Sequence, residues 1–143
     1  EPRIDYTLLR LVDLGSAHIA GYSLDGKIRG TEMILEELCR FFAHPFRWDT
    51  SGLYPQSARI RPEAGSSGLL AIRSVVLQAF DIRRVDASLR ALDSLPAEAA
   101  AAAFDGLRND YPLRPEFRHF SVDLDDGNAD TAGVLRGLGF SVA

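Results

Sequence analysis

The chain has 143 residues, of which 46% are hydrophobic and 25% are charged, and its formal net charge is −4. The apolar content excludes a disordered chain, and the length suits one domain that needs neither disulfides nor a metal to form its core. The acidic balance argues against a nucleic-acid partner, because phosphate-binding domains usually carry a basic excess.

Cysteine usage and apolar runs indicate the compartment. Cys39 is the only cysteine, which excludes an intrachain disulfide and any multi-cysteine metal site, and is typical of a reducing compartment. No apolar run approaches the roughly 18 residues of a membrane span, and no signal-peptide pattern is present. We therefore expect a cytoplasmic protein that makes no membrane contact.

The first part of the chain predicts strands followed by a helix. Residues 4–29 are interpreted as two or three antiparallel strands, because Asp25-Gly26 between short apolar runs is typical of a tight hairpin turn. Residues 31–43 carry apolar side chains at helical spacing behind Thr31, a suitable N-cap, and Pro45 ends this helix.

The remainder predicts more helix than strand. A short strand is expected at residues 58–60, and residues 64–68 form a Gly/Ser-rich connection. Helical stripes follow over residues 69–80 and 85–92, with Asp86 as a cap, and Pro96 opens a third helix. Residues 117–124 alternate as a strand, Asn128 caps a helix to about residue 137, and residues 140–142 form a last strand.

This order of elements predicts the fold class. Strands and helices follow one another without strict alternation, which favours an α+β arrangement. We expect residues 1–143 to form a single α+β domain, with a mainly antiparallel sheet and four to five helices packed on one face.

Residues 123–130 form an acidic segment whose carboxylates are of the type that binds a metal ion. Asp123 and Asp125 fall at the first and third positions of a calcium-binding loop. The glycine of that pattern arrives one residue early, however, and Val134 stands where the closing carboxylate belongs. We expect a polar turn and no metal.

The sequence from Asn128 to Phe140, NADTAGVLRGLGF, is similar to one family in its length and its ends. It resembles the strand–helix–strand that closes acetyl-CoA-dependent N-acetyltransferases, where an Asn opens the helix and Leu-Gly-Phe ends it. The resemblance covers 13 residues. Leu135 stands where that family often has a tyrosine as general acid, and no upstream loop resembles its pyrophosphate-binding loop. The resemblance implies a degenerate acyl-CoA-dependent N-acyltransferase-like domain.

The three histidines are His18, His44 and His119, and no two of them have the spacing of metal ligands on a helix. No Gly-x-Ser-x-Gly nucleophile motif is present. We expect each histidine to be structural or exposed.

The main binding candidate is the aromatic segment, residues 44–54. Trp, Tyr and Arg dominate interface hot spots because each combines a large contact area with a polar group. The alternative is that the aromatic rings close the core at the end of the preceding helix. The predicted contact residues are His44, Phe46, Arg47, Trp48 and Tyr54.

A basic set is a secondary candidate for binding a carboxylate or phosphate. The alternative is an ordinary helix surface of mixed charge, because acidic residues lie between the arginines. The candidate anion-binding residues are Arg108, Arg114, Arg118 and His119.

No phosphate loop, metal spacing or nucleophile motif can be read locally, so we predict no catalytic residues and no cofactor. The sequence favours a non-catalytic binding module: a partner-recognition or regulatory domain, or a subunit of a larger assembly, with a protein partner or a second copy of itself. The alternatives are the N-acyltransferase-like domain and a small-ligand sensor domain with an apolar pocket.

Overall fold

The computed structural model describes residues 1–125 and 129–143. In this part of the chain, the regular elements are six α-helices and three short strands. The helices are α1 (Tyr6–Leu9), α2 (Leu24–Phe41), α3 (Gly68–Ala79), α4 (Ile82–Ala91), α5 (Ala97–Asn109) and α6 (Ala129–Gly137). The strands are β1 (Ala58–Ile60), β2 (Phe120–Val122) and β3 (Ser141–Val142).

The chain divides into two compact units. Unit 1 comprises residues 1–20 and 80–112, and unit 2 comprises residues 21–79 and 113–143. The expectation of a single domain stays a prediction.

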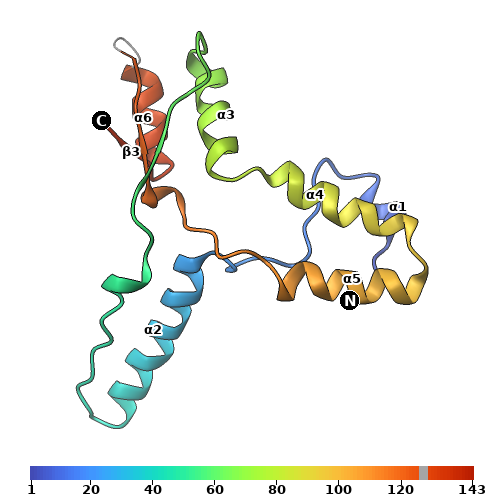
Figure 1. The fold of residues 1–143 in the computed structure, drawn as a ribbon. Coiled ribbons are helices and arrows are strands. Elements are labelled where there is room, and N and C mark those ends of the chain that lie inside the picture. Colours follow the sequence, from blue (N-terminus) through green and yellow to red (C-terminus); the bar gives the residue numbers. More distant parts are fainter. Residues whose placement is uncertain (126–128) are drawn as a thin grey trace. The chain divides into compact units, whose positions relative to one another are not determined.

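Unit 2 contains a parallel sheet in the order β1-β2-β3 (Figure 1). Ile60 pairs with Val122, and Val122 pairs with Val142. Helices α3 and α6 pack against the strands, because Val75 and Leu135 on these helices are fully buried in the same cluster as the apolar strand residues. Burial of this cluster is what stabilises such short strands.

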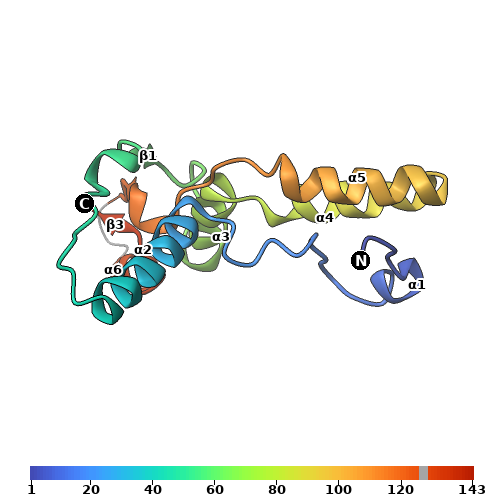
Figure 2. The same ribbon diagram turned by 90° about the horizontal axis from the view of Figure 1, so that it is seen from below.

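Unit 1 is built on α4 and α5, which lie side by side in both ribbon views (Figure 2). The side chain of Asp81 caps α4 by accepting a hydrogen bond from the amide of Arg83. Phe104 of α5 is 1% exposed, and Leu9 of α1 joins the same core. The first residues of the chain therefore pack on the α4–α5 pair.

The prediction of a mainly antiparallel sheet is wrong, since all three strands are parallel. The error came from residues 4–29, which contain α1, a loop and the start of α2 instead of a hairpin. Ser23 caps α2 by accepting a hydrogen bond from the amide of Gly26 at 2.9 Å. Asp25 then lies in the first helical turn, where a carboxylate is favoured by the helix dipole.

The other predicted elements were closer to the structure. The strand at residues 58–60 is confirmed, as are helices near residues 69–80, 85–92 and 97–109 and strands near residues 120 and 141. Asp86 does not cap α4, because Asp81 does. The predicted cap Asn128 and the middle of the acidic segment lie outside the described residues. No helix in the described ranges has both the length and the apolarity to cross a membrane.

Candidate functional site

Unit 1 presents a histidine held by a carboxylate. The Nδ1 atom of His18 lies 3.0 Å from Oε1 of Glu1, and the two side chains are 65% and 45% exposed. An ionised carboxylate can only accept hydrogen bonds, so Nδ1–H of His18 donates to it. In the neutral imidazole the Nε2 atom then carries the lone pair, which is the arrangement of a general base.

The backbone at His18 is unusual. Its φ angle is +55°, in the left-handed region that non-glycine residues rarely adopt. Ala43 has a similar angle, but it directly follows the C-cap of α2, where this conformation ordinarily ends a helix. His18 has no such helix end beside it, and strained residues of this kind cluster at functional sites.

A basic side chain of α5 approaches the same pair. Nη1 of Arg108 lies 3.5 Å from Oε2 of Glu1, the carboxylate oxygen not used by His18. Arg108 was predicted as part of an anion site. It lies in unit 1, whereas Arg114, Arg118 and His119 belong to unit 2.

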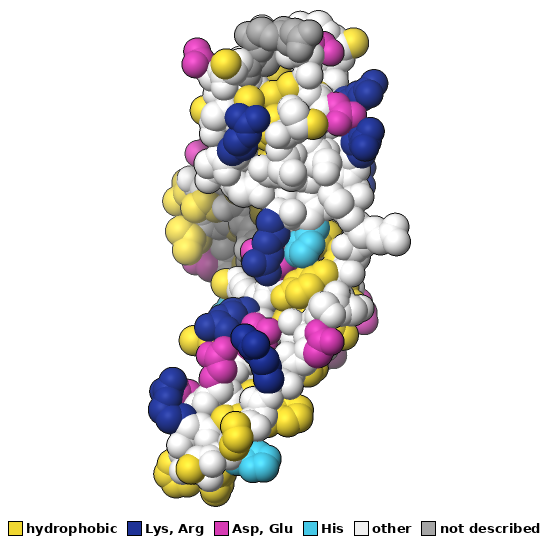
Figure 3. All heavy atoms as spheres, turned by 90° about the vertical axis from the view of Figure 1, so that its left-hand side faces the viewer, with side chains coloured by type: hydrophobic (Ala, Val, Ile, Leu, Met, Phe, Trp, Pro, Cys, Tyr) yellow, Lys and Arg dark blue, Asp and Glu magenta, His cyan; other side chains and the backbone are white. Residues whose placement is uncertain are grey.

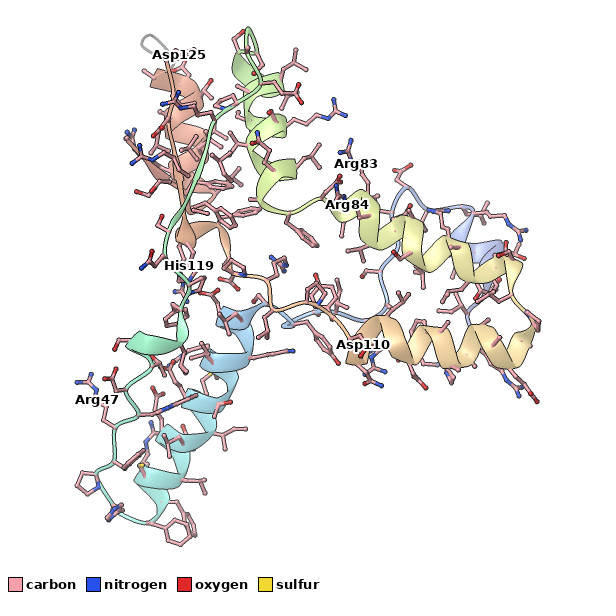
Figure 4. All side chains as sticks on the ribbon, in the orientation of Figure 1. Arg47, Arg83, Arg84, Asp110, His119 and Asp125 are labelled. Carbon is pink, nitrogen blue, oxygen red and sulfur yellow. The ribbon has the colours of Figure 1, made fainter. Side chains whose placement is uncertain are left out.

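Unit 2 contains a second histidine–carboxylate pair, which is buried. Asp25 is 2% exposed and accepts hydrogen bonds from the amide of Glu116 at 2.9 Å and from Nε of Arg118 at 2.6 Å. The Nε2 atom of His119 lies 2.7 Å from Oδ1 of Asp25. Figure 4 shows His119 beside the N-terminal end of α2, the helix that carries Asp25.

The electrostatics of this cluster favour an ionised Asp25. Burial raises the pKa of Asp25, but hydrogen bonds from the Glu116 amide, His119 and Arg118 outweigh it and hold the pKa below its ordinary value. Because the carboxylate is ionised at neutral pH, Nε2–H of His119 donates to it. The same contact with Asp25 raises the pKa of Arg118.

Aromatic and hydroxyl groups complete this cluster. Tyr54 stacks on the His119 ring with centroids 4.9 Å apart, and its own ring lies 5.6 Å from the guanidinium carbon of Arg118. Ser23 donates its hydroxyl proton to Glu116 at 2.9 Å, and the amide of Leu24 donates to the carbonyl of Arg114. The cluster therefore fastens the start of α2 to residues 114–119.

The predicted contact residues do not gather in one place. Tyr54 belongs to the Asp25 cluster, whereas His44, Phe46 and Arg47 are exposed in the segment after α2 and Trp48 is half-buried. Arg47 points away from α2 (Figure 4). A groove in this region is lined by Glu32, Leu35, Glu36, Phe46, Arg47 and Trp48.

The C-terminal end of α2 carries exposed apolar side chains, which gather at the lower end of Figure 3. Phe41 is 82% exposed and Phe42 is 68% exposed. Among residues 1–125 and 129–143, no group of three or more His, Cys, Asp or Glu side chains is arranged to hold a metal ion.

Comparison with known proteins identifies the family. Residues 55–139, more than half of the chain, match the family described as Domain of unknown function (DUF3410). The chain belongs to this DUF3410 family. The match runs from before β1 to the end of α6 and includes α4 and α5 of unit 1.

Longer relatives carry a functional name. The chain is 39% identical over 144 residues to the erythronate-4-phosphate dehydrogenase of Marinobacter nauticus, covering 99% of this chain and 38% of the relative. It is 34% identical to the protein of that name from Hahella chejuensis, covering 100% of this chain and 38% of the relative. For Yersinia pestis the identity is 37%, covering 99% of this chain and 36% of the relative. The DUF3410 chain thus spans little more than a third of these relatives.

These relatives overturn the predicted function. The prediction of a non-catalytic partner-recognition or regulatory module is wrong, because proteins that match nearly the whole chain are named as a dehydrogenase. The N-acyltransferase-like and sensor alternatives fail on the same finding. The segment that resembles the N-acetyltransferases, as far as the structure describes it, forms helix α6 and leads into β3. Strand β3 pairs with β2 in the parallel sheet.

Sequence reasoning missed both histidine pairs. Glu1 and His18 are 17 residues apart, and Asp25 and His119 are 94 residues apart, so neither pair forms a local motif. One feature of the sequence could have drawn attention to His18. It lies between Gly15 and Gly21, in a segment without regular apolar periodicity. That pattern indicates a loop, and loops on a rigid scaffold carry many catalytic residues.

Proposed function

We propose that this chain is part of an erythronate-4-phosphate dehydrogenase, in which His18 accepts the proton of the substrate hydroxyl group. The observation that carries the proposal is the hydrogen bond between His18 and Glu1 on an exposed surface of unit 1. Relatives with 34–39% identity over nearly the whole chain, all named as that enzyme, supply the reaction class.

The chemistry of dehydrogenation needs such a group. When an alcohol becomes a ketone, the carbon loses a hydride and the hydroxyl oxygen loses a proton. In this proposal the proton moves to Nε2 of His18 while the carbon gives up its hydride to an oxidised nicotinamide dinucleotide, so the C–O bond becomes C=O. Glu1 holds the imidazole in the tautomer that has Nε2 free to accept, and its charge stabilises the imidazolium that forms.

We assign no residue of this chain to binding of the hydride acceptor. The Gly-x-Gly-x-x-Gly fingerprint of a dinucleotide site does not occur in the sequence, and the connection from β1 to α3, residues 61–67, reads RPEAGSS. The proposal is therefore confined to proton transfer. A dehydrogenase of a phosphorylated sugar acid also fits the cytoplasmic location that the single cysteine favours.

Replacement of His18 tests the proposal in the full-length protein that contains this chain. The assay supplies erythronate 4-phosphate and nicotinamide dinucleotides and traps the carbonyl product with a hydrazine reagent. We expect His18→Asn to lower kcat by about 10²–10⁴-fold, the usual contribution of a general base. Glu1→Gln is expected to lower kcat by up to about 10⁴-fold, because an amide also stabilises the wrong tautomer of the His18 ring.

Glu98→Gln is the matched control for the loss of a carboxylate, since Glu98 is exposed on α5 of the same unit. Its kcat is expected to stay within twofold of the unmodified protein. A folded His18→Asn protein with unchanged kcat would overturn the role of His18. If the unmodified protein does not oxidise erythronate 4-phosphate, the substrate assignment is wrong.

A second proposal concerns protein contacts. We propose that the aromatic segment and the C-terminal end of α2 bind a protein partner. That partner is either another protein or a second copy of this chain. The exposure of Phe41, Phe42 and Phe46 supports this, because soluble proteins rarely leave neighbouring large apolar side chains open to water. No nucleic-acid or membrane partner is proposed.

A further inference from the structure

The segment that leads to His18 is tied to helix α4 by polar contacts. Arg90 of α4 donates from Nη1 to the carbonyl of Leu9 at 2.8 Å and from Nη2 to the carbonyl of Val12 at 2.9 Å. Its Nε donates to Asp86 at 2.8–2.9 Å. Asp86 in turn accepts a hydrogen bond from the amide of Gly15 at 2.8 Å. Three backbone groups between residues 9 and 15 are thus fixed by two side chains one helical turn apart.

The apolar side chains of this segment do not hold it in place between these points. Leu11 is 79% exposed, Val12 is 41% exposed and Leu14 is 49% exposed. Hydrophobic packing acts only at the two ends, where Leu9 and Ala17 are buried in the core of unit 1. The path of residues 11–16 therefore depends on the contacts with Arg90 and Asp86, while Arg10 is held by an exposed ion pair with Asp93 at 2.6 Å.

Gly15 shows how closely the segment approaches α4. A Cβ atom at this position would lie 2.5 Å from Cδ1 of Leu9 and 3.2 Å from Cδ2 of Leu89. The Asp86 carboxylate is therefore reached by the backbone amide directly. His18 follows three residues later, on the other side of the buried Ala17.

We propose that Asp86 and Arg90 are positioning residues that hold the segment carrying His18 in its catalytic place. This inference rests on the proposed function of His18. Both residues lie within the matched range 55–139, so a part of the DUF3410 domain acquires a defined task in a dehydrogenase. A planar guanidinium suits this task because it binds a carboxylate and two carbonyls in fixed directions.

The expected effect follows from the demands of proton transfer. A displacement of about 1 Å between reacting groups can lower a rate by about 10²-fold. Loss of the Gly15–Asp86 contact or of the Arg90 contacts should move His18 without removing it. The variants should therefore lose kcat by about 10–10²-fold, with a smaller change in KM.

The experiment uses the full-length protein with Asp86→Ala and Arg90→Ala, and with Asp86→Asn and Arg90→Lys as conservative variants. Asn retains an oxygen that can accept from the Gly15 amide, and Lys retains a donor for one carbonyl, so partial rescue is expected. Arg84→Ala is the matched control. Arg84, labelled in Figure 4, is on the same helix, its side chain is 89% exposed, and it forms a distant ion pair with Asp81 at 3.9 Å.

Two readouts separate positioning from simple loss of folded protein. The first is the primary deuterium isotope effect on kcat, measured with substrate deuterated at the carbon that loses hydride. Partial unfolding lowers kcat without changing this effect, whereas a misplaced base slows the chemical step and raises the effect where product release limits the unmodified protein. The second is amide hydrogen exchange of residues 9–18, which reports local opening independently of activity.

The proposal expects a lower kcat, a larger isotope effect and faster exchange of residues 9–18 in the two alanine variants, with Arg84→Ala unchanged. Unchanged kcat, or a lower kcat with both the isotope effect and the exchange of residues 9–18 unchanged, would overturn it. The His18→Asn variant distinguishes the two failures. If His18→Asn loses activity but the alanine variants of Asp86 and Arg90 do not, only the positioning role is wrong. If His18→Asn is fully active, the proposed function fails and the positioning role fails with it.

Discussion

The two histidine–carboxylate pairs of this chain use the same functional groups in different surroundings. The side chains of His18 and Glu1 are 65% and 45% exposed, whereas those of His119 and Asp25 are 15% and 3% exposed. In the described residues the hydrogen bond of the His18 ring is made by Nδ1, which leaves Nε2 on an open surface. The Asp25 carboxylate is occupied by three donors from residues 116–119.

This difference separates a group that can react from a group that stabilises. A general base must reach the proton that it removes, so it needs an accessible nitrogen. A buried carboxylate whose partners are all inside the protein leaves no room for a substrate. Removing one partner leaves a buried charge unpaired, which destabilises the fold. We therefore expect changes at His18 to alter activity and changes at Asp25 to alter stability.

The largest stability effect is expected at Asp25. Asp25→Ala removes the acceptor of three hydrogen bonds and leaves Arg118 and His119 without their carboxylate, which should cost about 3–5 kcal/mol of unfolding free energy. Urea unfolding at pH 7 measures this loss. Asp13→Ala, at an exposed position, is the control and should change stability by less than about 0.5 kcal/mol. A loss below about 1 kcal/mol at Asp25 would contradict the structural role of the buried pair.

The next largest effect is the pH dependence of the contribution that Asp25 makes to the free energy of unfolding. Although burial raises the pKa of Asp25, its hydrogen bonds hold the pKa below the unfolded value of about 3.9. The charge therefore stabilises the fold fully above about pH 4, and this stabilisation is lost as the pH falls through the folded pKa. The penalty of Asp25→Asn should shrink when unfolding is measured at pH 3 instead of pH 6. A penalty that is constant or larger at pH 3 would show that the charge is not what stabilises the cluster.

A smaller effect is expected from the stacking of Tyr54 on His119. Their ring centroids are 4.9 Å apart and the planes are inclined by 18°. Aromatic pairs in such geometry contribute about 0.5–1.5 kcal/mol beyond their buried area. A double-mutant cycle with Tyr54→Ala and His119→Ala should therefore give a coupling energy of about 1 kcal/mol in urea unfolding. Additive effects of the two substitutions would mean that Tyr54 does not support the His119–Asp25 pair.

The fold was predictable where one local signal dominated. Helices α3 and α4 follow regular apolar stripes, α5 begins directly after Pro96 as predicted, and β1 was located correctly. At Ser23-Leu24-Asp25-Gly26 two local signals compete, since Asp-Gly is typical of a hairpin and Ser followed by Asp is typical of a helix start. Tertiary contacts decide in favour of the helix, because Asp25 is needed as the buried partner of Arg118 and His119.

The sites were less predictable because their members are distant in sequence. Arg118 and His119 were named as anion-binding candidates, but nothing local indicates that Asp25 is their partner. Similarly, the Arg90 contacts with Leu9 and Val12 span 81 and 78 residues. Contacts between residues so far apart depend on how the helices and strands pack together. Local patterns in a single sequence do not predict that packing.

The smallest effect on stability is expected at Arg47 and Trp48, the part of the aromatic segment that lies outside the Asp25 cluster. Arg47 is exposed and Trp48 is half-buried, so Arg47→Ala combined with Trp48→Ala should cost no more than about 1 kcal/mol of unfolding free energy. The same variant should weaken protein contacts, which sedimentation measures as a shift of the full-length protein toward smaller species. Leu69→Ala is the control, because Leu69 on α3 is an apolar side chain that is 79% exposed. If the double variant unfolds, the aromatic rings belong to the core of unit 2, and the contact surface must be sought on the exposed phenylalanines at the end of α2.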